Sequence, residues 1–89
     1  MEYKSVLFLC DGPSDVRTNF DKYKSLNDYI SVNNSRNVIQ YKDKFIRFIN
    51  IYNPVFTNTT YSELVISDLA QSNASDRLKD VISEFNITH

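Results

Sequence analysis

The chain has 89 residues, 42% of them hydrophobic and 24% charged, with one Gly and two Pro; this predicts one small domain spanning residues 1–89 and excludes disordered and collagen-like chains. Ten Lys and Arg against eleven Asp and Glu give a net charge of −1, which indicates neither a polybasic nucleic-acid surface nor an acidic DNA mimic. Because no apolar run approaches the roughly 18 residues of a membrane span and no export signal is evident, we expect a cytoplasmic protein with no membrane contact.

The first predicted elements are a buried strand and an amphipathic helix. The apolar run Val6-Leu7-Phe8-Leu9-Cys10 is typical of a central strand of an α/β sheet, covered on both faces. Asp11-Gly12-Pro13-Ser14 supplies a turn and a helix start. Apolar side chains then recur at helical spacing, which predicts a helix over about residues 14–30: Val16, Phe20, Tyr23 and Ile30.

The middle of the chain predicts a β-hairpin after a polar loop at residues 31–35. Residues 37–41 and 45–52 are rich in β-branched and aromatic side chains, and Lys42-Asp43-Lys44 separates them. Asn53-Pro54 should end the second strand, because proline cannot donate a ladder hydrogen bond. Residues 55–61 are expected to form a loop.

The last part of the chain predicts one more strand and a helix. Residues 63–68 form a short apolar segment that ends in a carboxylate, and the apolar spacing of residues 78–85 predicts a helix over about residues 74–86. The predicted fold is therefore α/β: a mixed sheet of about four strands and two helices, in the order strand, helix, strand, strand, strand, helix.

Three carboxylates are candidate metal ligands. If the strands ending at Asp11 and Asp68 are parallel neighbours, both acids lie at the carboxyl edge of the sheet, where open α/β folds place ligands. Together with Asp15 they would offer the oxygen ligands that Mg²⁺ prefers. Asp after a strand is also a common turn former and helix cap, so a structural role is the alternative.

No catalytic residue is assigned from the sequence. Cys10 is the only cysteine and lies in an apolar strand, which favours an inert thiol. His89 is the only histidine and the last residue, a poor position for a general base. Gly12 is the only glycine, so the chain has no Walker A loop.

The hairpin carries the candidate binding residues. Aromatic and basic side chains alternate there, as on sheets that stack nucleic-acid bases: Tyr41, Lys42, Lys44, Phe45, Arg47 and Phe48. Aromatic residues in strands also serve as cross-strand and core packing. Any that the small core cannot bury would form an exposed apolar patch, which marks a protein partner or a homodimer.

Two family resemblances accompany these patterns. The segment from Asn37 to Ala70 resembles the middle of a phage terminase large subunit, with residues 61–70 similar to a Walker B strand. Asp68 stands at the position of that family's metal-organising acid, but Leu69 replaces the Glu that orients the attacking water. Because a Walker A loop is also missing, this resemblance implies a partner-binding sheet core without ATP turnover.

The second resemblance is to TOPRIM nuclease and primase domains. Leu7 to Asp15 looks like their strand ending in Glu-Gly, with Asp11 in place of the Glu. Ile66-Ser67-Asp68 looks like the start of their Asp-x-Asp motif, with Ala70 at the second acid. This resemblance implies a metal site with fewer ligands than the family uses.

The expected function is a non-enzymatic protein-binding module that acts through its hairpin and loop surface. Richness in Asn, Lys, Ile, Tyr and Ser is typical of a low-GC genome, and with the short chain it favours a phage or mobile-element accessory or inhibitor protein. The partner would be a host or viral protein, or a second copy of the chain. The alternatives are a Mg²⁺-dependent phosphoryl-transfer or nuclease-like fragment, and a nucleic-acid-binding module using the basic aromatic hairpin.

Overall fold

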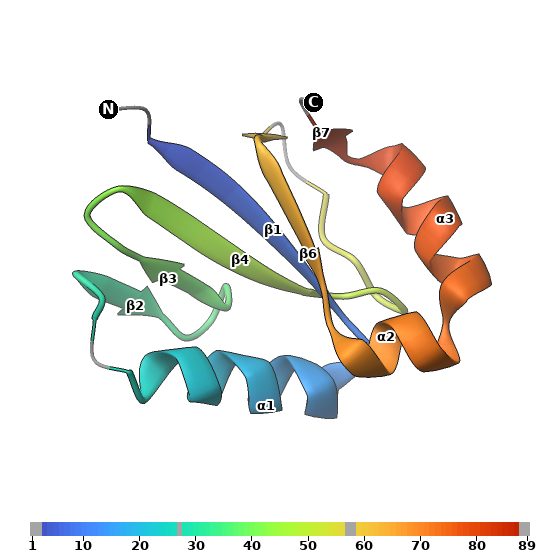
Figure 1. Ribbon diagram of the computed structural model, residues 1–89, viewed down its shortest axis with the longest axis horizontal. Coiled ribbons are helices and arrows are strands. Elements are labelled where there is room, and N and C mark those ends of the chain that lie inside the picture. Colours follow the sequence, from blue (N-terminus) through green and yellow to red (C-terminus); the bar gives the residue numbers. More distant parts are fainter. Residues whose placement is uncertain (1–2, 27, 57–58, 88–89) are drawn as a thin grey trace.

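The structure is a computed structural model that describes residues 3–26, 28–56 and 59–87, and its central element is a five-stranded mixed sheet (Figure 1). The strand order is β2-β3-β4-β1-β6. These strands are β1 (Lys4–Cys10), β2 (Ser31–Asn33), β3 (Val38–Gln40), β4 (Lys44–Asn50) and β6 (Glu63–Ile66). The predicted mixed α/β class is confirmed, and the described residues form one more strand in the sheet and one more helix than expected.

Strand β1 lies between β4 and β6 and runs parallel to both. Leu7 pairs with Leu64 and Leu9 pairs with Ile66, which confirms the predicted parallel contact between the two apolar strands. The Ser67 N–H donates to the Leu9 carbonyl at 2.9 Å and extends this pairing past the end of β6. The carboxyl ends of the three parallel strands therefore meet at one edge.

Helices cover both faces of the sheet, as Figure 1 shows. Because side chains alternate between the faces of a strand, β1 contributes to two cores. Val6, Phe8 and Cys10 pack with α1 (Pro13–Lys24), together with Ile46 and Phe48 of β4. On the opposite face, Leu7 and Leu9 pack with residues of α2 (Asp68–Asn73) and α3 (Ser75–Glu84), among them Ala70, Leu78 and Val81.

The first helix is shorter than predicted and the following loop contains a strand. Helix α1 ends at Lys24, where the Ser25 hydroxyl donates to the Lys22 carbonyl and competes with helix continuation. The Ile30 N–H instead donates to the Gln40 carbonyl at 2.7 Å. This bond continues into β2, which pairs antiparallel with β3, so the expectation of a loop at residues 31–35 is wrong over residues 31–33.

The predicted antiparallel hairpin is confirmed. Ile39 pairs with Ile46, and the Tyr41 N–H donates to the Lys44 carbonyl at 2.7 Å to close the loop. Strand β4 ends at Asn50, two residues earlier than expected, because the Asn53 N–H turns back to the Asn50 carbonyl.

The C-terminal part differs most from the prediction. Strand β6 ends at Ile66, since Ser67 caps α2 by accepting from the Ala70 N–H, so Asp68 begins a helix and does not end a strand. The expected helix over residues 74–86 is α3, which stops at Glu84. A second, two-stranded parallel sheet joins β5 (Thr60–Tyr61) to β7 (Asn86–Ile87). The expectation of a loop at residues 55–61 is wrong over residues 60–61, which form β5, and residues 57–58 lie outside the described part.

Within the described ranges, no helix is both long and apolar enough to cross a membrane.

Candidate functional site

A buried carboxylate joins three elements at the carboxyl edge of the sheet. Asp15, in the first turn of α1, is only 5% exposed. Its Oδ2 accepts from the Asp11 N–H at 2.7 Å and from the Ser67 hydroxyl, and its Oδ1 accepts from the Asn19 amide at 3.0 Å. Because Ser67 also caps α2, this one side chain connects the end of β1, helix α1 and helix α2.

Asp11 lies beside this cluster and also has partners on both oxygens. Its Oδ1 accepts from the Tyr52 hydroxyl at 2.7 Å, and its Oδ2 accepts from the Asn73 side-chain amide at 3.2 Å. Donation to the carboxylate stabilises the neutral phenol, so the pKa of Tyr52 is raised. Asp11 therefore joins the segment after β4 to the end of α2.

The structure brings together two of the three predicted metal ligands. Asp11 and Asp15 are linked through the Asp11 N–H, whereas Asp68 is exposed on the first turn of α2. Among the described residues, no group of three or more Asp, Glu, His or Cys side chains is placed to hold a metal ion. The magnesium site stays a prediction, and His89 lies outside the described residues.

Cys10 lies beneath the acidic cluster in the core. Its side chain is fully buried, and the Asn19 amide lies 3.9 Å from its sulfur. Burial, followed by the negative charge of Asp15, raises the pKa of the Cys10 thiol to about 12. A thiol with this pKa is protonated at physiological pH, so the arrangement disfavours nucleophilic chemistry.

The six predicted hairpin residues are not arranged as a stacking surface. Tyr41 and Phe48 are buried in the core beneath α1, so neither ring offers a free face. Phe45 is half-buried against the opposite core, 6.4 Å from the ring of Tyr61. The remaining three are basic: Lys42 is exposed, Lys44 lies over the ring of Tyr41, and Arg47 is half-buried.

Exposed apolar side chains gather instead in the loop that follows β4. Tyr52, Val55 and Phe56 are 53%, 64% and 48% exposed. Phe56 is partly supported, because its ring centroid lies 4.7 Å from that of Phe85 at the end of α3. These three residues lie within five positions of one another in the chain, and we call them together the loop patch.

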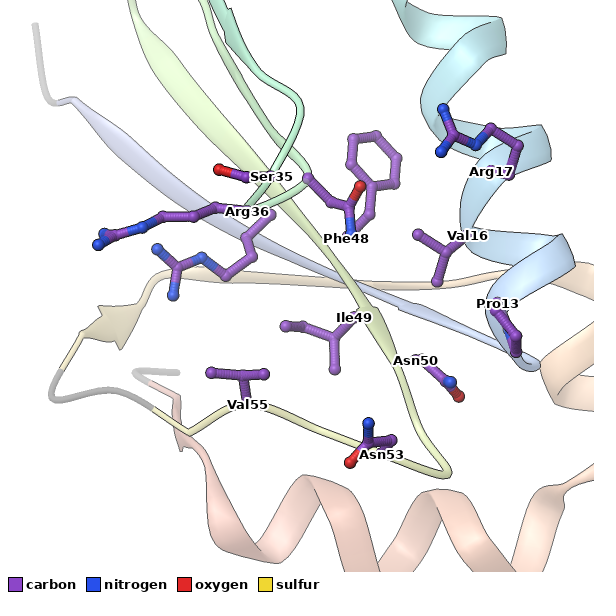
Figure 2. A pocket seen from close by; sticks show the side chains of 12 residues that line it. Pro13, Val16, Arg17, Ser35, Arg36, Phe48, Ile49, Asn50, Asn53 and Val55 are labelled. Carbon is purple, nitrogen blue, oxygen red and sulfur yellow. The ribbon is translucent and has the colours of Figure 1, made fainter.

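A pocket of about 610 Å³ opens where the β2–β3 hairpin ends beside β4 (Figure 2). Pro13, Val16 and Arg17 of α1 lie on one side of the end of β4, and Asn53 and Val55 on the other. A second pocket of about 540 Å³ follows the hairpin, and the two share Ser35, Arg36 and Arg47. None of the described residues that line either pocket is acidic.

Several of these positions escaped the sequence analysis. Asn19 stands four residues after Asp15 on one helix face, a spacing that indicates contact once the helix is accepted. Ser is a common helix-capping residue, and the Ser67 side chain accepts from the N–H three residues later, at Ala70. Arg36 gave no local signal, and neither did the contacts of Tyr52 and Asn73 with Asp11, because the chain fold alone decides what lies beside these residues.

Comparisons with protein-family models, with curated proteins and with solved structures found no match for this chain. The terminase and TOPRIM resemblances therefore stay predictions, and the function is inferred from the geometry.

Proposed function

We propose that the protein is a non-enzymatic binding module that engages a protein partner through the loop patch. The observation that carries this proposal is the placement of Tyr52, Val55 and Phe56, each about half exposed or more, within five consecutive residues. A protein surface that gathers large apolar side chains in one segment is typical of a contact site. Aromatic residues in particular are enriched at the centres of such contacts.

The acidic edge supports a binding role over an enzymatic one. Both carboxylates of Asp11 and Asp15 already accept hydrogen bonds from protein groups on each oxygen. The same bonds hold Tyr52, because its hydroxyl donates to Asp11. Because its hydroxyl is already held, the Tyr52 ring loses less conformational freedom when a partner binds. The acidic edge therefore orders one end of the loop patch before binding.

The partner expected for this surface presents apolar side chains of its own. A host or viral protein fits that description, as does a second copy of the chain, and a phage or mobile-element origin would supply the former. Light scattering at several concentrations distinguishes the two, because a homodimer raises the mass without any other protein.

The contact is tested by placing a photo-crosslinker at position 52 and, as a matched control, at the exposed Leu26 far along the chain. Irradiation in a lysate of a candidate host should give an adduct from position 52 and none from position 26. The double variant Tyr52→Ser/Phe56→Ser should lose the same partner in a pull-down, whereas Leu26→Ser/Ile30→Ser should retain it. A partner captured equally by both double variants, or a strict monomer that captures nothing, would contradict the proposal.

A further inference from the structure

The two pockets beside the β2–β3 hairpin lie where strand pairing stops. Strand β3 pairs with β4 from Phe45 to Arg47, and the last bond is from the Phe48 N–H to the Asn37 carbonyl at 2.9 Å. The end of β4 then runs on without β3, and Ile49 and Asn50 line the larger pocket. The cavity is therefore a consequence of a hairpin that is shorter than the strand it joins.

Local hydrogen bonds fix the turn that carries Arg36. The Asn33 side-chain oxygen accepts from the Ser35 hydroxyl at 2.8 Å and from the Arg36 N–H at 3.1 Å. Asn37 adopts a positive φ of 55°, a conformation that Asn tolerates better than most residues. Arg36 is exposed on this defined turn, so its guanidinium has a fixed point of attachment.

Arg47 reaches the same place from β4. It pairs with Val38, which follows Arg36 by only two residues, and both arginines line both pockets. Apart from Arg17, the remaining polar side chains among the described lining residues are amides and hydroxyls, with no carboxylate. This combination attracts an anion.

We propose that the pockets bind a small molecule bearing a phosphate group, with the phosphate at the exposed Arg36. Guanidinium groups match phosphate oxygens with paired, charge-assisted hydrogen bonds. The rest of the ligand extends along β4 toward the amides of Asn50 and Asn53 and the apolar side chain of Val55. A volume of about 610 Å³ lies within the range of small-molecule sites. The positive end of α1, marked by Pro13, and the charge of Arg17 border the same cavity.

The site is tested by titrating the full chain with inorganic phosphate and with ribose 5-phosphate while recording amide shifts. Saturable shifts are expected at the turn and the end of β4, with ribose 5-phosphate binding more tightly because it also contacts Asn53 and Val55. Arg36→Gln should weaken both ligands about tenfold, the usual cost of a lost charge-assisted hydrogen bond. Arg36→Lys should recover only part of that loss, because an ammonium group cannot bind in the paired manner.

Lys79→Gln is the matched control, since it removes one exposed positive charge from α3, outside both pockets. Its affinity for ribose 5-phosphate should equal that of the unmodified chain. The proposal would be overturned if Lys79→Gln and Arg36→Gln lowered the affinity for ribose 5-phosphate equally. It would also be overturned if the shifts did not saturate at about 20 mM ligand, since this excludes all but the weakest binding. Tighter binding of a Glu-rich peptide than of ribose 5-phosphate would also overturn it and would assign the pockets to carboxylates. The Tyr52→Ser/Phe56→Ser variant keeps Val55, which the loop patch and the larger pocket share, and it should bind phosphate normally, so the two proposals are tested separately.

Discussion

The acidic edge and the arginine-lined pockets are both polar, and both border the end of β4, yet they use their charges in opposite ways. Asp15 is buried and its oxygens accept three hydrogen bonds from its own chain. Arg36 is exposed on a turn that is itself held by Asn33, and none of the described residues that line the pockets with it is acidic. A charge that is buried with its partners stabilises the fold, whereas an exposed charge on a rigid support is available to a ligand.

The sequence draws attention to the acids, whereas the structure draws it to the arginines. Two acids at the ends of neighbouring strands are conspicuous in the sequence, and isolated arginines in a turn and a strand are not. In the structure, Asp68 is exposed at the start of α2, and Asp11 and Asp15 hold α1, α2 and the segment after β4 together. The arginines come together only because β3 and β4 pair in one register.

The largest expected effect concerns Cys10, which lies beneath the acidic edge. Its pKa of about 12, against an ordinary value of 9.0, leaves roughly 1000-fold less thiolate at pH 8, since each pKa unit is a factor of ten. Alkylation of the native chain by iodoacetamide should be slower than alkylation in urea by at least that factor. A native rate within tenfold of the unfolded rate would show that the edge is open to solvent.

The second prediction removes the charge at the centre of the acidic edge. Asp15→Ala leaves the Asp11 N–H, the Ser67 hydroxyl and the Asn19 amide without their acceptor, and unsatisfied buried groups are costly. We expect a loss of about 3 kcal/mol in the free energy of unfolding, measured by urea denaturation.

Two variants serve as controls for Asp15→Ala and test the comparison directly. Asp68 and Arg36 are both exposed, so Asp68→Ala and Arg36→Gln should each change stability by no more than about 0.5 kcal/mol. If Asp15→Ala were as mild as these, the buried carboxylate would have no special structural role. If Arg36→Gln lowered stability as much as Asp15→Ala, Arg36 would be a structural group. That result would contradict its proposed role as the residue that binds phosphate.

The sequence predicted the parts of the fold that hydrophobic patterns encode. Each of three elements was predicted from a pattern within its own residues. These patterns are the apolar run of β1, the β-branched and aromatic residues of β3 and β4, and the helical spacing of apolar residues in α3. The end of α1 and the strand β2 were missed because hydrogen bonds between distant residues decide them. The Ile30 N–H, for example, finds its acceptor at Gln40 on the far side of a turn.

The candidate site was harder to predict than the fold. The rings of Tyr41 and Phe48 look available in the sequence, but alternation along the hairpin turns both toward α1 and into the core. Val55 and Phe56 were assigned only to a loop, and nothing local marks them as exposed. Exposure and burial depend on how the two helical layers cover the sheet, and this is not encoded in a short window of residues.

A third, smaller effect is expected at the cap that joins the acidic edge to α2. Ser67→Ala removes the acceptor for the Ala70 N–H and one donor to Asp15. Loss of a helix cap typically costs about 1 kcal/mol, so we expect a loss of about 1.5 kcal/mol by urea denaturation. Ser72→Ala is the matched control because Ser72 is exposed in the same helix, and equal effects of the two variants would contradict the role of the cap.

The smallest effect concerns Tyr52, where the acidic edge meets the loop patch. Its neutral hydroxyl donates to Asp11, so its pKa lies above the unfolded value of 10.0. The stabilisation from this bond is fully present below pH 10 and is lost as the pH rises through the native pKa. Tyr52→Phe should therefore be less stable than the unmodified chain at pH 8, with the difference shrinking above pH 10.

The same bond can be observed without unfolding the protein. In a chain labelled with ¹³C at the tyrosine rings, the Tyr52 resonance should titrate at lower pH in Asp11→Asn, since the carboxylate that raises the pKa is gone. Asp68→Asn removes an equal charge from the exposed start of α2 and should leave the titration of Tyr52 unchanged. Identical titration of Tyr52 in the unmodified chain and in Asp11→Asn would mean that Asp11 does not hold the ring. The loop patch would then have to reach its partner without support from the acidic edge.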